Sequence, residues 1–135
     1  MKRLITLLSA GLLTLGAAAA IAHDHDGASA KSAAAAKKTI TGEVVDTGCY
    51  LSHGAKGEKH VSCANKCISQ GMPMGLLTDN GTLYLITLNH DNADPYNGLK
   101  EQAGKKVSVT GTVMTRNGMK AIDAEEFKPL AANTN

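Results

Sequence analysis

The sequence contains no tryptophan, one phenylalanine and three tyrosines. A hydrophobic core built from this chain must therefore rest on Val, Ile, Leu, Met and Ala side chains. One domain of this size can bury such a core, but a disulfide or a metal ion would add useful support. The scarcity of aromatic residues directs attention to the three cysteines.

The sequence also lacks an excess of charge of either sign. It has 14 basic and 12 acidic side chains. Two of the basic residues, Lys2 and Arg3, open a segment that resembles a secretory signal. Without them the chain is formally neutral and has no basic patch to hold phosphates, which argues against nucleic acid as a partner.

Residues 1–22 follow the order of a secretory signal peptide. Basic residues come first, then the apolar stretch Leu4 to Leu15, then small residues in an A-x-A motif that ends at Ala22. A membrane anchor needs about 20 apolar residues, whereas this shorter stretch is interrupted by Ser, Gly and Thr. We therefore expect cleavage after Ala22 and a periplasmic or secreted protein without stable membrane insertion.

Both ends of the expected mature chain have a composition that is unsuited to a folded core. Residues 23–37 have almost no large apolar side chain, so they are expected to form a flexible alanine-rich tether, and 131–135 a disordered tail. Cleavage after Ala22 would make His23 the first residue. Its amine, backbone nitrogens and the His25 imidazole could then surround cupric or nickel ions in a square plane. A merely polar tail is the alternative.

Residues 38–130 form the expected domain, and most of its apolar pattern has a period of two. The runs that favour strands are 39–45, 75–78, 82–87, 106–114 and 119–127. Turn signals at Asn80-Gly81 and Asn117-Gly118 separate the second strand from the third and the fourth from the fifth. Gly42, inside the first run, suggests a bulge.

Two intervening stretches favour helices. Residues 58–70 have Val61, Ala64 and Ile68 on one stripe and Gly71 placed to end the helix, and a shorter helix is expected within 96–103. The order predicts a mainly β fold, a small five-stranded OB-like Greek-key barrel. It has a cysteine-bearing helix inserted after the first strand and a short helix between strands three and four.

The final hairpin predicts part of the core of this barrel. One face of the fourth strand should turn Val107, Val109 and Val113 inward, with a phase shift at Gly111, against Ile122 of the returning strand.

The three cysteines and one histidine, Cys49, His60, Cys63 and Cys67, form the clearest chemical cluster. Thiolates and an imidazole suit zinc or copper. In a helix over 58–70, Cys63 and Cys67 lie on one face with His60 on the neighbouring turn, and Cys49 arrives from the end of the first strand. A metal site of three cysteines and one histidine is therefore predicted, although C-x13-C-x3-C lacks the paired C-x2-C of typical zinc sites.

Two methionines are weaker ligand candidates. Met72 and Met74 carry thioethers that would suit cuprous copper, but methionine is also ordinary core material.

A disulfide is the competing interpretation of the cysteines. Cys49 could pair with Cys63 or Cys67, and closing a loop of about fifteen residues would stabilise the fold by roughly 3 kcal/mol. Cys63 and Cys67 are a poor pair, because helical Cβ atoms four residues apart are separated by about 5–6 Å and a disulfide needs roughly 3.5–4.5 Å. The chain would then be an interaction domain for an unidentified periplasmic protein.

A thiol-redox protein is the second alternative, but the motifs of known thiol chemistry are missing. The sequence has no C-x2-C for a thioredoxin-like reaction and no C-x2-C-H for covalent haem. We therefore expect a binding protein and not an enzyme.

The motifs VVDTGCYLSHG, HVSCANKCISQG and GMPMGLL, followed by GKKVSVTGTV, resemble a family of small exported bacterial proteins. That family has the pattern D-x2-C, H-x2-C-x3-C, G-x-P and no established activity. The resemblance covers roughly residues 42–126. It implies a barrel built around the cysteine segment and no catalytic role. The positions it carries over are Asp46, Cys49, His60, Cys63, Cys67 and Pro73.

Overall fold

The computed structural model describes residues 35–131. The predicted signal segment, His23, His25 and the tail 132–135 lie outside these residues. Within the described range, no helix has the length and apolar character needed to cross a membrane. The elements in chain order are β1 (Ala36–Asp46), α1 (Thr47–His53), η1 (Glu58–His60), α2 (Val61–Ser69), β2 (Met74–Leu77), β3 (Leu83–Leu88), α3 (Asp94–Leu99), η2 (Lys100–Gln102), β4 (Lys106–Arg116) and β5 (Met119–Pro129).

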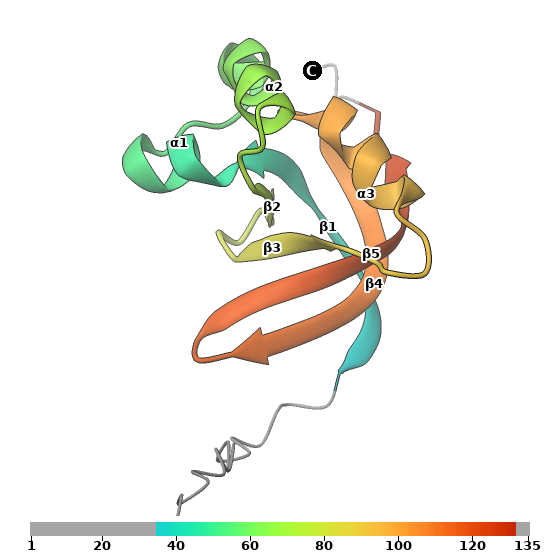
Figure 1. Cartoon of the computed structure of the whole chain (residues 1–135). Coiled ribbons are helices and arrows are strands. Elements are labelled where there is room, and N and C mark those ends of the chain that lie inside the picture. The colour runs from blue at the N-terminus through green and yellow to red at the C-terminus, as the bar shows by residue number, and fades with distance from the viewer. Residues whose placement is uncertain (1–34, 132–135) are drawn as a thin grey trace, which may run out of the picture.

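The five strands close into a barrel in the order β1-β2-β3-β5-β4 (Figure 1). All neighbours are antiparallel except β3 and β5, which are parallel. Helices α1 and α2 follow the first strand, and α3 lies between β3 and β4. The predicted mainly β, OB-like barrel with these two helical connections is confirmed.

The β4–β5 hairpin closes through a two-residue turn. Asn117 and Gly118 have φ values of 49° and 84°, which is the backbone that a two-residue hairpin with the twist of its strands requires. The register shifts between Thr110 and Gly111, as predicted, and a Cβ at Gly111 would lie 1.9 Å from the carbonyl oxygen of Asp123. Glycine is therefore required at this position, because the β5 backbone leaves no room for a Cβ.

The barrel interior contains the inward face that the alternation predicts. Val107, Val109 and Ile122 are fully buried, and the half-buried Val113 packs against them. Helix α2 contributes Ala64 and Ile68 to the same cluster, as its apolar stripe predicts. The other buried members are Val44, Met74, Leu76, Ile86, Leu99, Ala103 and Ala124. The core is thus aliphatic, and Tyr84, Tyr96 and Phe127 pack against it.

Three local predictions were wrong. The pairing of β1 with β4 runs without a shift through Gly42, so this glycine marks no bulge; a Cβ there would lie 2.6 Å from the Leu77 carbonyl oxygen. Strand β1 begins at Ala36 and not at Thr39, because its first residues extend the pairing with β4. The helix expected over 58–70 is divided into η1 and α2.

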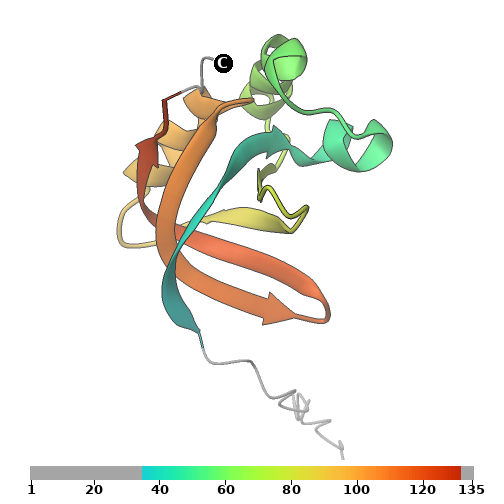
Figure 2. The same cartoon turned by 180° about the vertical axis from the view of Figure 1, so that it is seen from behind.

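Helices α1 and α2 lie together at one end of the barrel, and the β4–β5 turn lies at the other (Figures 1 and 2). The cysteines are all in these two helices. The fold thus places the candidate chemistry at the end of the barrel where strand β1 stops.

Candidate metal centre

Strand β1 ends at Asp46, and the same residue begins α1. Its side-chain Oδ1 accepts hydrogen bonds from the backbone N–H groups of Gly48 (2.8 Å) and Cys49 (3.3 Å), which is the N-cap arrangement that aspartate favours. Gly54, with φ 74°, closes the helix and donates its N–H to Tyr50. The sequence prediction missed α1 and placed Cys49 at a strand end. An Asp cap followed by a closing glycine was the available signal.

Backbone hydrogen bonds hold the start of α1 against the chain that follows α2. The N–H and the hydroxyl of Thr47 both donate to the Pro73 carbonyl oxygen, at 3.0 and 2.9 Å. The Met72 N–H in turn donates to the Cys67 carbonyl oxygen at 3.0 Å. Cys49 and Cys67 are therefore brought near each other by bonds that do not involve their thiols.

Helix α2 is oriented by its apolar residues. Ala64 and Ile68 are buried in the barrel core. Cys63 and Cys67 each precede one of them by one residue, about 100° around the helix, and so lie on the flank of the apolar face. Cys63 is exposed, whereas Cys67 and Cys49 are half-buried.

The three sulfur atoms lie within 4.8 Å of one another, and all three cysteines of the chain are free thiols. In a tetrahedral site with metal–sulfur bonds of about 2.3 Å the sulfurs are about 3.8 Å apart, whereas a disulfide requires about 2.05 Å. A metal ion therefore needs a movement of at most about 1 Å from the present separations. Cys49, Cys63 and Cys67 are positioned to hold a metal ion.

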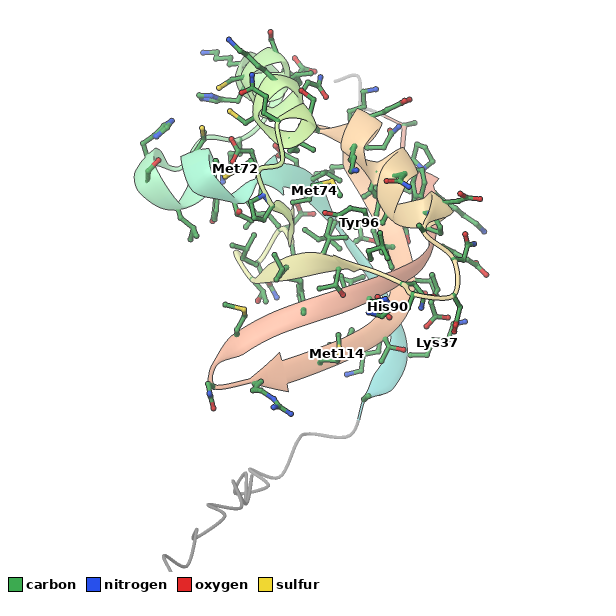
Figure 3. The ribbon with its side chains drawn as sticks, viewed as in Figure 1. Lys37, Met72, Met74, His90, Tyr96 and Met114 are labelled. Atoms are coloured by element: carbon green, nitrogen blue, oxygen red, sulfur yellow. The ribbon has the colours of Figure 1, made fainter. Side chains whose placement is uncertain are left out.

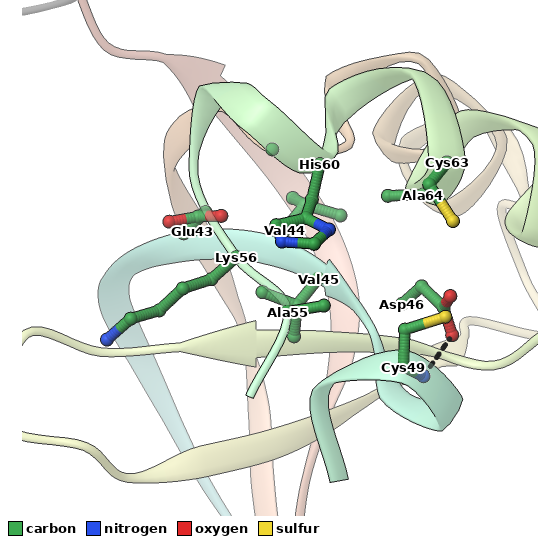
Figure 4. Close-up of a pocket in the computed structure, with 11 residues that line it drawn as sticks. Glu43, Val44, Val45, Asp46, Cys49, Ala55, Lys56, His60, Cys63 and Ala64 are labelled. Carbon is green, nitrogen blue, oxygen red and sulfur yellow. Dashed lines mark hydrogen bonds between the residues drawn. The ribbon is translucent and has the colours of Figure 1, made fainter. Parts of the chain in front are cut away.

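His60, the fourth predicted ligand, does not join this group. It lines the same pocket as Cys49 and Cys63, but the ligand atoms that lie within 4.8 Å of one another are the three sulfurs. Its ring lies across the pocket from the two sulfurs (Figure 4) and is tilted against the ring of His53, with centroids 6.2 Å apart. The structure thus brings together three of the four predicted residues. His60 is the N-cap residue of α2 and does not lie within that helix. Its side chain therefore starts at the junction between η1 and α2.

The pocket beside the thiols is small. Its volume is about 10 Å³, close to the minimum that admits one water molecule. Its lining residues are Glu43, Val44, Val45, Asp46, Cys49, Ala55, Lys56, His60, Cys63, Ala64 and Gly104. Such a space has room for a single atom or ion.

Asp46 and two of the thiols influence one another. Burial alone would raise the pKa of the Asp46 carboxyl, but hydrogen bonds from the Cys49 thiol, from the backbone N–H groups of Cys49 and Gly48, and from the Cys67 thiol outweigh it, so that pKa is lowered. The hydrogen bond to Asp46, followed by burial and the nearby charges, raises the pKa of Cys49 to about 12. Burial, and then the hydrogen bond to Asp46, raises the pKa of Cys67. Without a metal, the raised pKa values keep both of these thiols protonated.

The two methionines have different positions (Figure 3). Met74 is 1 % exposed and belongs to the hydrophobic core, where its thioether fills space. Met72 is 39 % exposed, and a Cβ on Gly48 would meet its sulfur at 2.8 Å. Only Met72 therefore covers the turn that carries Cys49.

No model of a protein family, no curated protein and no solved structure matches this chain. The functional argument therefore depends on the geometry of the site.

Proposed function

We propose that this protein is an exported binding protein that holds one zinc or copper ion through Cys49, Cys63 and Cys67. The observation that carries the proposal is the approach of three thiol sulfurs to within 4.8 Å of one another. Thiolates are strong ligands for both metals. A disulfide between two helices would need only two cysteines, whereas a metal site can use all three as ligands.

The surroundings of the thiols support metal binding over catalysis. The adjoining pocket has room for one atom or ion. The cap at Asp46 and the Thr47–Pro73 hydrogen bonds hold the thiol-bearing segments in place independently of the sulfurs. A metal ion would then bind a partly formed site and add a connection between α1 and α2.

The openness of the site favours an ion that can exchange. Here Cys63 is exposed, and the other two thiols are only half-buried. An ion held there would be accessible from one side, as the handling of a metal by an exported protein requires.

Native mass spectrometry of protein isolated from the periplasm tests the proposal directly. One bound ion is expected, lost on acidification, with three titratable thiols after denaturation. Cobalt substitution should give thiolate-to-cobalt charge-transfer absorption. Cys67→Ser should weaken that absorption and the binding of cobalt, because one of the three thiolates is lost, and the matched control Lys66→Ser, on the neighbouring exposed position, should leave both unchanged. Replacing His23 and His25 by alanine in all samples removes the possible N-terminal copper site.

The disulfide alternative has a different result in the same experiment. The mass would lie about 2 Da below that of the reduced chain, with one titratable thiol and no ion. That result would overturn the metal proposal and leave an interaction domain stabilised by Cys49 with Cys63 or Cys67. Reversible formation of the bond at a physiological potential would instead favour the thiol-redox alternative.

A further inference from the structure

Three thiolates leave one position of a tetrahedral metal site without a ligand. Asp46 is 2 % exposed and is the one buried charged residue in the described range 35–131. Its Oδ1 caps α1. Its Oδ2 is buried and has no hydrogen-bond partner among the described residues. Such an atom normally has a partner, so its free lone pairs require an explanation.

The Asp46 carboxylate lines the same pocket as Cys49 and Cys63, on the side of the pocket where their sulfurs lie (Figure 4). A bound metal would displace the thiol protons, because the thiolate is the ligand. The carboxylate would then lie buried beside thiolates, with like charges gained and still no partner for Oδ2. Direct contact with the metal would remove both penalties.

We propose that Oδ2 of Asp46 is the fourth ligand, and that three cysteines and one aspartate form a centre for a divalent ion such as zinc, with His60 outside it. The inference rests on the proposed function, since it requires metal binding by the three thiols. Carboxylate oxygen is an established zinc ligand, with bonds of about 2.0–2.2 Å. The Asp46 oxygens are not among the ligand atoms that already lie within 4.8 Å of one another, so the side chains would have to close further around the ion for this bond to form. The two backbone N–H groups on Oδ1 would fix the carboxylate while Oδ2 binds the metal.

Charge selects the class of ion. Three thiolates and one carboxylate carry four negative charges, so a divalent ion leaves the same net charge as a zinc site of four cysteines. A cuprous ion would leave one more negative charge in a partly buried site, and it prefers soft sulfur to oxygen. Asp46 therefore favours zinc over cuprous copper.

X-ray absorption spectroscopy of the full chain loaded with one equivalent of zinc tests the ligand set without any change at Asp46. His23 and His25 are replaced by alanine to remove other imidazoles from the N-terminus. We expect three sulfurs at about 2.3 Å and one oxygen at about 2.0–2.2 Å, without the multiple scattering of an imidazole. A spectrum with imidazole scattering would overturn the inference.

Two variants separate Asp46 from His60. Asp46→Asn keeps the Oδ1 acceptor that caps α1 but removes the anionic oxygen. We expect it to weaken zinc binding more than about 100-fold, beyond the usual effect of an outer-shell change, and to weaken cuprous binding less. His60→Ala should leave zinc affinity and the cobalt spectrum nearly unchanged. The reverse pattern would overturn the inference, and circular dichroism of both variants checks that each remains folded.

Failure of the inference and failure of the proposed function have different signatures. If the parent chain and Asp46→Asn bind zinc equally with three sulfurs, Asp46 is not a ligand and the site of three thiolates remains. If the parent chain binds neither zinc nor copper, the proposed function and this inference fall together.

Discussion

The two ends of the barrel differ in how the sequence specifies them. At one end, the β4–β5 hairpin alternates inward and outward residues and turns at Asn117-Gly118, with all its signals adjacent in the sequence. At the other end, α1 and α2 depend on a cap at Asp46 and on bonds from Thr47 to Pro73, 26 residues away. The first end is specified locally, and the second is assembled by contacts between distant segments.

The difference has a consequence for stability. The hairpin contributes fully buried valines and Ile122 to the core, so a change there should affect the whole fold. The helical end contributes Ala64 and Ile68, but its cysteines lie on the flank. We therefore expect metal binding to act mainly on α1 and α2, with the barrel able to fold without it.

The largest effect is expected from Val109→Asp. Val109 is fully buried between Ile40 of β1 and Phe127 of β5 in the register of the sheet. An unpaired charge there costs several kcal/mol, a large part of a typical stability of about 5–15 kcal/mol. Urea denaturation should show an unfolded or severely destabilised domain. Thr115→Asp, at an exposed position of the same strand, should melt like the parent, and equal melting of both variants would refute the assigned inward face.

Metal removal should have the next largest effect, confined to one end. A ligand present at about 1,000 times its dissociation constant stabilises the native state by about 4 kcal/mol. Hydrogen exchange with and without a chelator should show lost protection in α1 and α2, while amides of the β4–β5 hairpin change little. Loss of protection throughout the barrel would mean that the metal holds the whole fold and that the two ends are not independent.

The sequence predicts the hairpin better than the helical end, because only the hairpin is specified by local signals. The alternation of β4 and β5, their turn and the phase shift at Gly111 were predictable, because each signal lies within a few residues. Helix α1 was not predicted, since its seven residues include Gly48 and follow a strand directly. The exclusion of His60 from the thiols depends on how η1 meets α2, and no local pattern encodes that junction. Asp46 was known only through the resemblance, and its buried Oδ2 is a property of the folded chain.

A smaller effect should separate Asp46→Ala from Asp46→Asn in metal-free, reduced protein. Both substitutions remove the charge, but only asparagine keeps an oxygen that accepts from the Gly48 and Cys49 N–H groups. The alanine variant should be less stable by about 1 kcal/mol, the usual effect of losing an N-cap. Chemical denaturation in chelator measures the difference. Equal stabilities would show that the cap does not hold α1. The proposed metal site would then not be partly formed before the ion binds.

The smallest effect concerns a carboxylate of the barrel wall, for contrast with Asp46. Glu125 accepts from Lys37 at 2.7 Å and from the Thr112 hydroxyl at 3.1 Å; the Lys37 hydrogen bond, and then that of Thr112, lower its pKa below 4.5. An acid whose pKa is lowered by folding stabilises the fold at pH values above its ordinary pKa. This contribution is lost as the pH falls through the pKa of the folded state.

Lys37→Met should therefore raise the pKa of Glu125 in an NMR titration and reduce stability slightly at neutral pH, with the difference from the parent vanishing well below pH 4.5. Lys37 is largely exposed, so salt should weaken the effect at neutral pH. Lys38→Met, at the next exposed position of β1, is the matched control and should leave the Glu125 titration unchanged. If both variants changed the pKa of Glu125 equally, the net charge of the protein and not the Lys37 contact would set that pKa. Asp46, held by backbone donors and thiols away from solvent, should respond to neither variant.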